Sequence, residues 1–112
     1  MMKALLMTNN VAVTEFGVSI SPSSFVTRTT NGGYRTPKFT CNVSGGVGPF
    51  EYLWTSDGLS VDSPTSQKTS FTTTGYNDYV LATAYCEVTD TGNGNQKLST
   101  SATIEIEFGS LQ

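Results

Sequence analysis

Apolar residues stand at every second position over long stretches of this chain. In the segment from Ala102 to Phe108, apolar side chains alternate with Thr103, Glu105 and Glu107. This period of two is that of a strand with one buried face, whereas a helix needs apolar residues three and four positions apart. No window of the sequence shows helical spacing over three turns. An almost all-β chain is therefore predicted.

Other segments show the same alternation. A second long strand is predicted where four inward-facing residues recur at every second position, namely Ala82, Ala84, Cys86 and Val88. Shorter strands are predicted where apolar or β-branched residues alternate between turn signals, at 16–20, 25–30, 39–43, 50–54, near Val61 and around Phe71.

Turn-forming residues separate these segments. The clearest signals are Asn31-Gly32-Gly33, the run SGGVGP at 44–49, Asp57-Gly58 and the run DTGNGNQ at 90–96. In the last of these, the Asn93-Gly94 pair is predicted to take positive φ at both turn positions. Roughly seven or eight short strands with such spacing predict a β-sandwich. A chain of 112 residues has the size of one domain.

The charge pattern limits the partners. Only 13% of the residues are charged, and the net charge is -3. Without a basic patch, neither nucleic-acid binding nor membrane insertion is expected. The N-terminus reads MMKALLMTNN, and its apolar run is too short for a secretory signal. Synthesis in the cytosol is therefore expected.

The sequence lacks the residues that most catalytic sites require. The sequence contains no histidine and only two cysteines, which excludes a Ser-His-Asp triad, a Cys-His pair, and His-ligated or Cys₄ zinc. Asp57, Asp62, Asp78 and Asp90 all fall in predicted turns, where aspartate usually serves as a turn former. A converging carboxylate pair would be the alternative. We predict no enzyme, no catalytic residues, no metal and no cofactor.

Three residues are predicted to form the centre of the core. By the alternation, Cys41, Trp54 and Cys86 all point inward, from different strands. The two sheets of a sandwich enclose a core about 10 Å thick, which an indole against two sulfurs would fill.

With this Cys–Trp–Cys spacing, the chain resembles an immunoglobulin-like domain. The resemblance rests on FTCNV, YLW and YCEVTD and covers about residues 14 to 108. It implies an immunoglobulin-like Greek-key β-sandwich. Where immunoglobulins place a tyrosine two residues before the second cysteine, this chain has Ala84, and Tyr85 should point outward. Two states remain open for Cys41 and Cys86, a disulfide bond or two free thiols. Synthesis in the cytosol produces thiols first, and a disulfide would form only by later oxidation.

A closer resemblance is to the immunoglobulin-like domains of tailed-bacteriophage virion proteins. It rests on a Gly-Gly-rich loop before an aromatic-x-aromatic-x-Trp strand (GGVGPFEYLW) and on CEVTD before a Gly/Asn turn. It implies a non-enzymatic virion protein, synthesised in the host cytoplasm, that decorates the capsid and helps particles adhere to host or glycan surfaces. The alternative is a tail-associated or other carbohydrate- or cell-surface-binding module.

Two segments are candidate contact sites. The first is an N-terminal arm at 1–13, ahead of the domain at 14–112, with apolar residues Leu5, Leu6, Met7, Val11 and Val13. An exposed apolar arm is a liability unless covered. We expect it to dock on other virion subunits; the alternative is that it packs on its own sandwich as an extra edge strand.

The second candidate contact site is at the opposite end of the predicted sandwich. It contains five residues suited to stacking on and hydrogen bonding a sugar, namely Tyr34, Tyr76, Asn77, Asp78 and Tyr79. The alternative is a structural corner whose polar groups are simply solvated.

Overall fold

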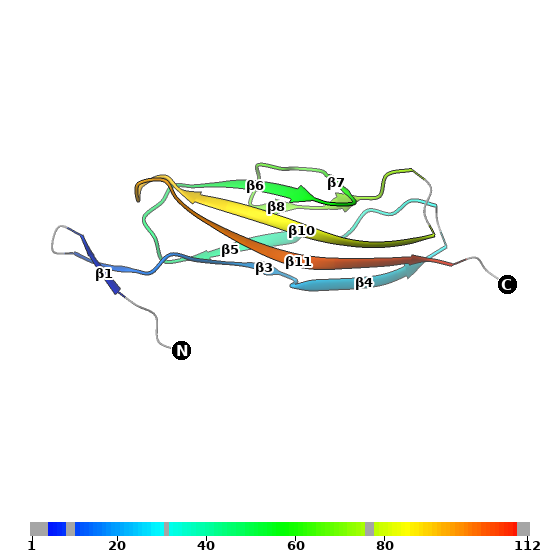
Figure 1. Cartoon of the computed structure of the whole chain (residues 1–112), viewed down its shortest axis with the longest axis horizontal. Coiled ribbons are helices and arrows are strands. Elements are labelled where there is room, and N and C mark those ends of the chain that lie inside the picture. The colour runs from blue at the N-terminus through cyan, green and yellow to red at the C-terminus, as the bar shows by residue number, and fades with distance from the viewer. Residues whose placement is uncertain (1–4, 9–10, 31, 76–77, 110–112) are drawn as a thin grey trace.

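The structure, a computed structural model, describes residues 5–8, 11–30, 32–75 and 78–109. It is all-β, with no helix in these residues. Figure 1 shows an elongated molecule in which long strands run lengthwise in two layers. This arrangement is compatible with a β-sandwich.

The larger sheet has four strands in the order β4-β11-β10-β6. They are β4 (Ser24–Thr29), β6 (Phe50–Ser56), β10 (Tyr79–Asp90) and β11 (Gln96–Phe108). β10 pairs antiparallel with both β6 and β11, while β4 runs parallel to β11. The two longest strands therefore form the centre of this sheet.

The second layer is a three-stranded sheet in the order β3-β5-β8. Its strands are β3 (Gly17–Ser21), β5 (Phe39–Ser44) and β8 (Lys68–Thr69). Next to it, β7 (Ser60–Val61) pairs with β9 (Phe71–Thr72).

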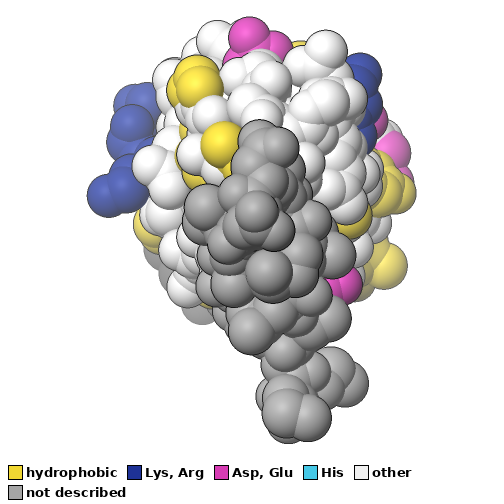
Figure 2. Space-filling view, turned by 90° about the vertical axis from the view of Figure 1, so that its left-hand side faces the viewer, with side chains coloured by type: hydrophobic (Ala, Val, Ile, Leu, Met, Phe, Trp, Pro, Cys, Tyr) yellow, Lys and Arg dark blue, Asp and Glu magenta, His cyan; other side chains and the backbone are white. Residues whose placement is uncertain are grey.

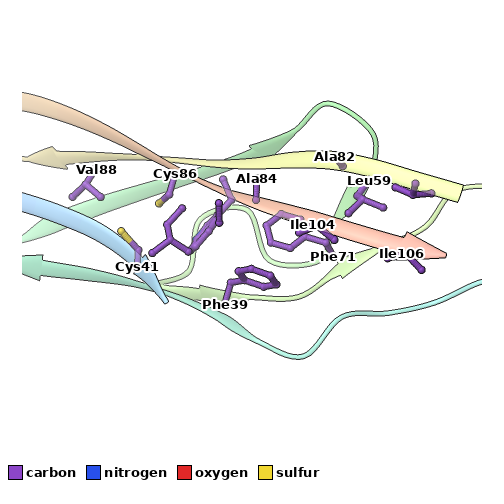
Figure 3. Packing of buried hydrophobic residues seen from close by; sticks show 14 of the residues in the cluster. Phe39, Cys41, Leu59, Phe71, Ala82, Ala84, Cys86, Val88, Ile104 and Ile106 are labelled. Atoms are coloured by element: carbon purple, nitrogen blue, oxygen red, sulfur yellow. The ribbon is translucent and has the colours of Figure 1, made fainter. Parts of the chain in front are cut away.

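The predicted alternation is confirmed in the two long strands. Along β10 the inward residues are buried while Leu81 and Tyr85 are exposed, and along β11 Ala102, Ile104 and Ile106 are buried. The buried apolar side chains of both layers meet in one cluster (Figure 3). It includes Phe39 and Cys41 from the three-stranded sheet, and Val88 and Ile104 from the four-stranded one.

The described residues contain eleven strand segments, more than the seven or eight predicted. Two of the additional segments form an N-terminal hairpin, β1 (Leu5–Thr8) with β2 (Val11–Thr14). The strand predicted around Phe71 is divided, because β8 pairs with β5 whereas β9 pairs with β7. Between them the carbonyl of Ser70 accepts a hydrogen bond from Asp62 N (3.0 Å).

The turn between β10 and β11 corrects a prediction. Positive φ falls on Gly94 (65°) and Asn95 (60°), not on Asn93. The turn is longer than two residues, because Asn93 N donates to Asp90 O (3.1 Å) and Gln96 N donates to Asn93 O (3.3 Å). The left-handed pair therefore lies one residue later in the chain than predicted, at Gly94 and Asn95.

Candidate functional site

The cysteines and the tryptophan lie at the centre of the core. Cys41, Trp54 and Cys86 are all buried, with at most 1% of their surface exposed. Trp54 and Cys86 are register partners on β6 and β10 of the same sheet, and Cys41 lies on β5 of the opposite sheet. The two sulfur atoms point toward each other across the core (Figure 3).

The cysteines are free thiols in this structure. The hydrogen bond with Cys41 and, after it, burial raise the pKa of the Cys86 thiol far above its usual value. Cys86 therefore keeps its proton at neutral pH. Both thiols are completely buried, and buried cysteines without access to solvent are inert, so the pair contributes to packing.

An aromatic chain continues the core away from the sulfurs. Trp54 packs edge-on against Phe71, with ring centroids 5.8 Å apart, and Phe71 packs edge-on against Phe39 at 5.4 Å. The indole Nε1 donates to the carbonyl of Ser66 (2.6 Å). The polar atom of the tryptophan is thus satisfied although the ring is buried.

At the end of the molecule nearest the N-terminus, a buried carboxylate holds the loop at 45–49. Asp90, the last residue of β10, is fully buried. Its Oδ1 accepts a hydrogen bond from Gly48 N (2.8 Å) and its Oδ2 accepts one from Val47 N (3.0 Å). Buried carboxylates are stable only when hydrogen-bonded in this way. The sequence predicted Asp90 as a turn former; instead it is a strand residue that fixes a neighbouring loop.

Two glycines let this loop and the turn at 91–95 approach each other. A Cβ atom on Gly92 would collide with the carbonyl oxygen of Gly48. A Cβ atom on Gly46, whose φ is +75°, would lie 2.6 Å from Asp90 Oδ2. The glycine-rich sequence at 45–48 therefore serves close backbone packing around Asp90.

The N-terminal hairpin forms a separate two-stranded sheet. β1 and β2 pair only with each other, in the register Leu5↔Thr14 to Thr8↔Val11. Neither strand extends the two larger sheets, contrary to the edge-strand alternative. The hairpin projects from one end of the molecule (Figure 1). β2 ends at Thr14, one residue beyond the predicted arm.

Figure 2 views the molecule from this end. Most of the described surface is white, with yellow apolar patches, Lys and Arg at the two flanks, and Asp and Glu at the top and the right. Val47, at the tip of the loop that Asp90 holds, is one exposed apolar residue, with 56% of its surface accessible. A Cβ atom on Gly92 would lie 2.8 Å from Val47 Cγ1, closer than van der Waals contact allows.

Three of the five residues of the predicted tyrosine cluster lie in the described part of the chain. Tyr34 is partly buried and stacks on Phe25, with centroids 6.3 Å apart. Tyr79 is exposed, and its hydroxyl donates to Glu105 Oε2 (2.9 Å). This hydrogen bond raises the pKa of the Tyr79 hydroxyl. Asp78 is exposed, while Tyr76 and Asn77 lie outside the described residues.

The remaining aspartates of interest make structural contacts. Asp57 Oδ1 accepts from Thr83 N (2.8 Å), and Asp62 accepts from Arg35 Nε (2.7 Å) and Thr72 Oγ1 (2.9 Å). Among the described residues, no three acidic or cysteine side chains gather into a group that could hold a metal ion. The same residues contain no helix long and apolar enough to cross a membrane.

No protein-family model matches this chain, and neither the curated proteins nor the solved structures compared with it give a match.

Proposed function

We propose that this chain is a non-enzymatic structural protein of a tailed-phage virion, with an immunoglobulin-like domain displayed on the capsid surface. The strand order supports the immunoglobulin-like part of this proposal. The first two strands of the two larger sheets lie in different layers. β3 pairs with β5 in one layer, and β4 pairs in parallel with the last strand, β11, in the other. Buried cysteines on β5 and β10 with a tryptophan on β6 agree with that topology.

The observation that carries the anchoring part is the separate N-terminal hairpin. A two-stranded hairpin is at best marginally stable alone in water. β1 and β2 pair with no other strand in the described part of the chain. We therefore assign the stabilisation of this hairpin to a neighbouring virion subunit.

A matched pair of substitutions tests this anchoring. Val13→Asp places a charge in the hairpin, and Val47→Asp makes the same change on an exposed loop at the same end. The assay is cosedimentation of each purified protein with particles that lack the chain. We expect Val13→Asp to abolish binding and Val47→Asp to fold and bind. Equal binding by both variants would refute anchoring through the hairpin.

Presence in the virion is tested separately. Mass spectrometry of purified particles of the encoding phage should find the chain, and antibodies against it should label intact capsids. Labelling confined to tails would favour a tail position, and absence from the particles would refute the virion assignment.

The end opposite the hairpin is the part that we propose for adhesion. β10 begins there at Tyr79, which is 51% exposed. Binding of the intact protein to a glycan array, lost in Tyr79→Ala, would support adhesion through this end. An array without any binding would remove the glycan role and leave the structural role untouched.

A further inference from the structure

Two potential nucleophiles face each other inside the core. Cys41 and Cys86 are the only cysteines of the chain, and both are completely buried. They lie on β5 and β10, in opposite sheets, and their sulfur atoms point toward each other (Figure 3). The two thiols are also hydrogen-bonded to each other. A disulfide bond between them would therefore join the two layers of the molecule.

Cys86 lies on a strand that is paired on both sides. Its register partners are Trp54 on β6 and Thr100 on β11, because β10 is an interior strand of the four-stranded sheet. Its sulfur faces the core, among the buried apolar side chains. A reagent can reach this sulfur only if the two layers separate.

Cys41 is enclosed in the same way. It pairs with Ile20 on β3, and β5 is the middle strand of its sheet. On the other side of β5, Cys41 N donates to the carbonyl of Gln67 (2.9 Å), and Gln67 Nε2 donates to the carbonyl of Cys41 (3.0 Å). Fraying of an edge strand therefore exposes neither sulfur. Core strands of this kind open with a free energy close to that of global unfolding.

This enclosure controls what the thiols can react with. A disulfide forms when a thiolate attacks a sulfur of an existing disulfide, so the attacking cysteine must be both ionised and accessible. The folded Cys86 thiol is neither, because its pKa is raised far above the usual value and its side chain is buried. In the unfolded chain both thiols are accessible and ionise near their ordinary pKa of 9.0.

We propose that Cys41 and Cys86 form a redox-sensitive pair whose state is fixed when the chain folds and is then protected by the core. A chain that folds with two thiols keeps them in an oxidising solution, and a chain that folds with the disulfide keeps the bond in a reducing one. This inference does not depend on the virion assignment.

The oxidant is a small disulfide such as glutathione disulfide, and the reaction takes place in the unfolded chain. One cysteine thiolate attacks the reagent, forms a mixed disulfide and displaces one glutathione. The second cysteine attacks the protein sulfur of that mixed disulfide and displaces the other glutathione. Two electrons pass from the cysteines to the reagent, and the two thiol protons end on the two glutathione molecules.

Thiol titration of the full-length, reduced protein tests the protection. The reagent is an aromatic disulfide that releases a coloured thiolate. We expect the folded protein to react at least about 1,000-fold more slowly than the chain unfolded in urea, because a domain of ordinary stability is unfolded for a smaller fraction of the time than that. At intermediate urea concentrations, the rate should follow the unfolded fraction measured by Trp54 fluorescence. Val47→Cys adds a thiol on an exposed loop, and this thiol should react at once in the folded protein.

Folding in the presence of an oxidant tests the bond. Protein diluted from urea into a mixture of reduced and oxidised glutathione should yield a monomer lighter by two hydrogens than the reduced protein. The closed loop contains about 45 residues, which on the chain-entropy model should raise Tm by about 16 °C. Once folded, this protein should keep the bond in dithiothreitol. The double variant Cys41→Ala with Cys86→Ala should have the same Tm after folding with or without glutathione.

The proposal fails in three cases. Native thiols that react as fast as the one in Val47→Cys, or at a rate independent of urea, are not protected by the core. Folding with glutathione that yields only free thiols or mixed disulfides would show that the folded chain does not accept a bond between the two sulfurs. A disulfide that dithiothreitol reduces without unfolding the protein is not sealed by the fold.

Discussion

Replacing Asp90 with alanine should loosen one end of the molecule. The substitution removes both acceptors that hold the 45–49 loop and leaves Val47 N and Gly48 N without them. A hydrogen bond to a charged group contributes about 1.5–3 kcal/mol. Water can reach the partly exposed loop and recover part of this, so we expect a loss of about 3 kcal/mol.

That loss is a large fraction of the total stability. A domain of this size unfolds with a free energy of about 5–15 kcal/mol, and each kcal/mol shifts Tm by about 4 °C. Urea unfolding followed by tryptophan fluorescence measures the free energy, and a Tm lower by about 12 °C should accompany it. Asp90→Asn keeps one acceptor and should cost about half as much.

Amide hydrogen exchange measures the effect of Asp90→Ala at individual residues. Val47 and Gly48 should lose protection in Asp90→Ala, while the paired amides of β10 and β11 keep theirs. If Asp90→Ala unfolds within about 0.5 kcal/mol of the wild type, the usual range for surface changes, the carboxylate does not hold the loop and the reasoning fails.

Three further predictions concern the turn, the tryptophan and the thiols. Gly92→Ala should lower the free energy of unfolding in urea by about 2 kcal/mol, because the new Cβ atom collides with Gly48. Gly94→Ala, which has open space but a φ of +65°, should lower it by only about 1 kcal/mol, and equal losses would contradict the close approach at Gly92. The single tryptophan, 1% exposed, should emit at short wavelength and resist quenching by acrylamide, and strong quenching in the folded protein would place Trp54 outside the core. Under reducing conditions the unfolded Cys86 thiol ionises near its ordinary pKa of 9.0, while the folded thiol, with its raised pKa, does not. The contribution of this thiol to stability should therefore be lost above pH 9.0, by at most about 1.4 kcal/mol per pH unit; Cys86→Ala should show a shallower fall above that pH, and identical slopes would contradict the raised pKa.

Strand positions could be predicted because burial imposes a period of two. Every second residue from Ala82 to Val88 is buried, and the apolar letters alone reveal this. The exposed position of Tyr85 follows from the same rule. The N-terminal hairpin could not be foreseen in this way, because its apolar residues fit an edge strand equally well and only the backbone register separates the two.

Asp90 shows where residue type misleads. An aspartate beside Thr-Gly-Asn-Gly resembles a turn residue, and turn propensity is a local preference. Its actual role depends on two amides more than 40 positions away, which no local pattern encodes. The division of the strand at Ser70 and the displacement of positive φ to Asn95 likewise depend on pairing between distant segments.

The most direct test of the proposed role is hydrogen exchange of residues 5–14 in the isolated protein and on the particle. A two-stranded hairpin alone is marginally stable, so its amides should exchange rapidly in the isolated protein while those of β10 and β11 stay protected. Bound to particles, the hairpin amides should become protected. Strong protection already in the isolated protein, or no gain on the particle, would contradict docking through the N-terminal hairpin.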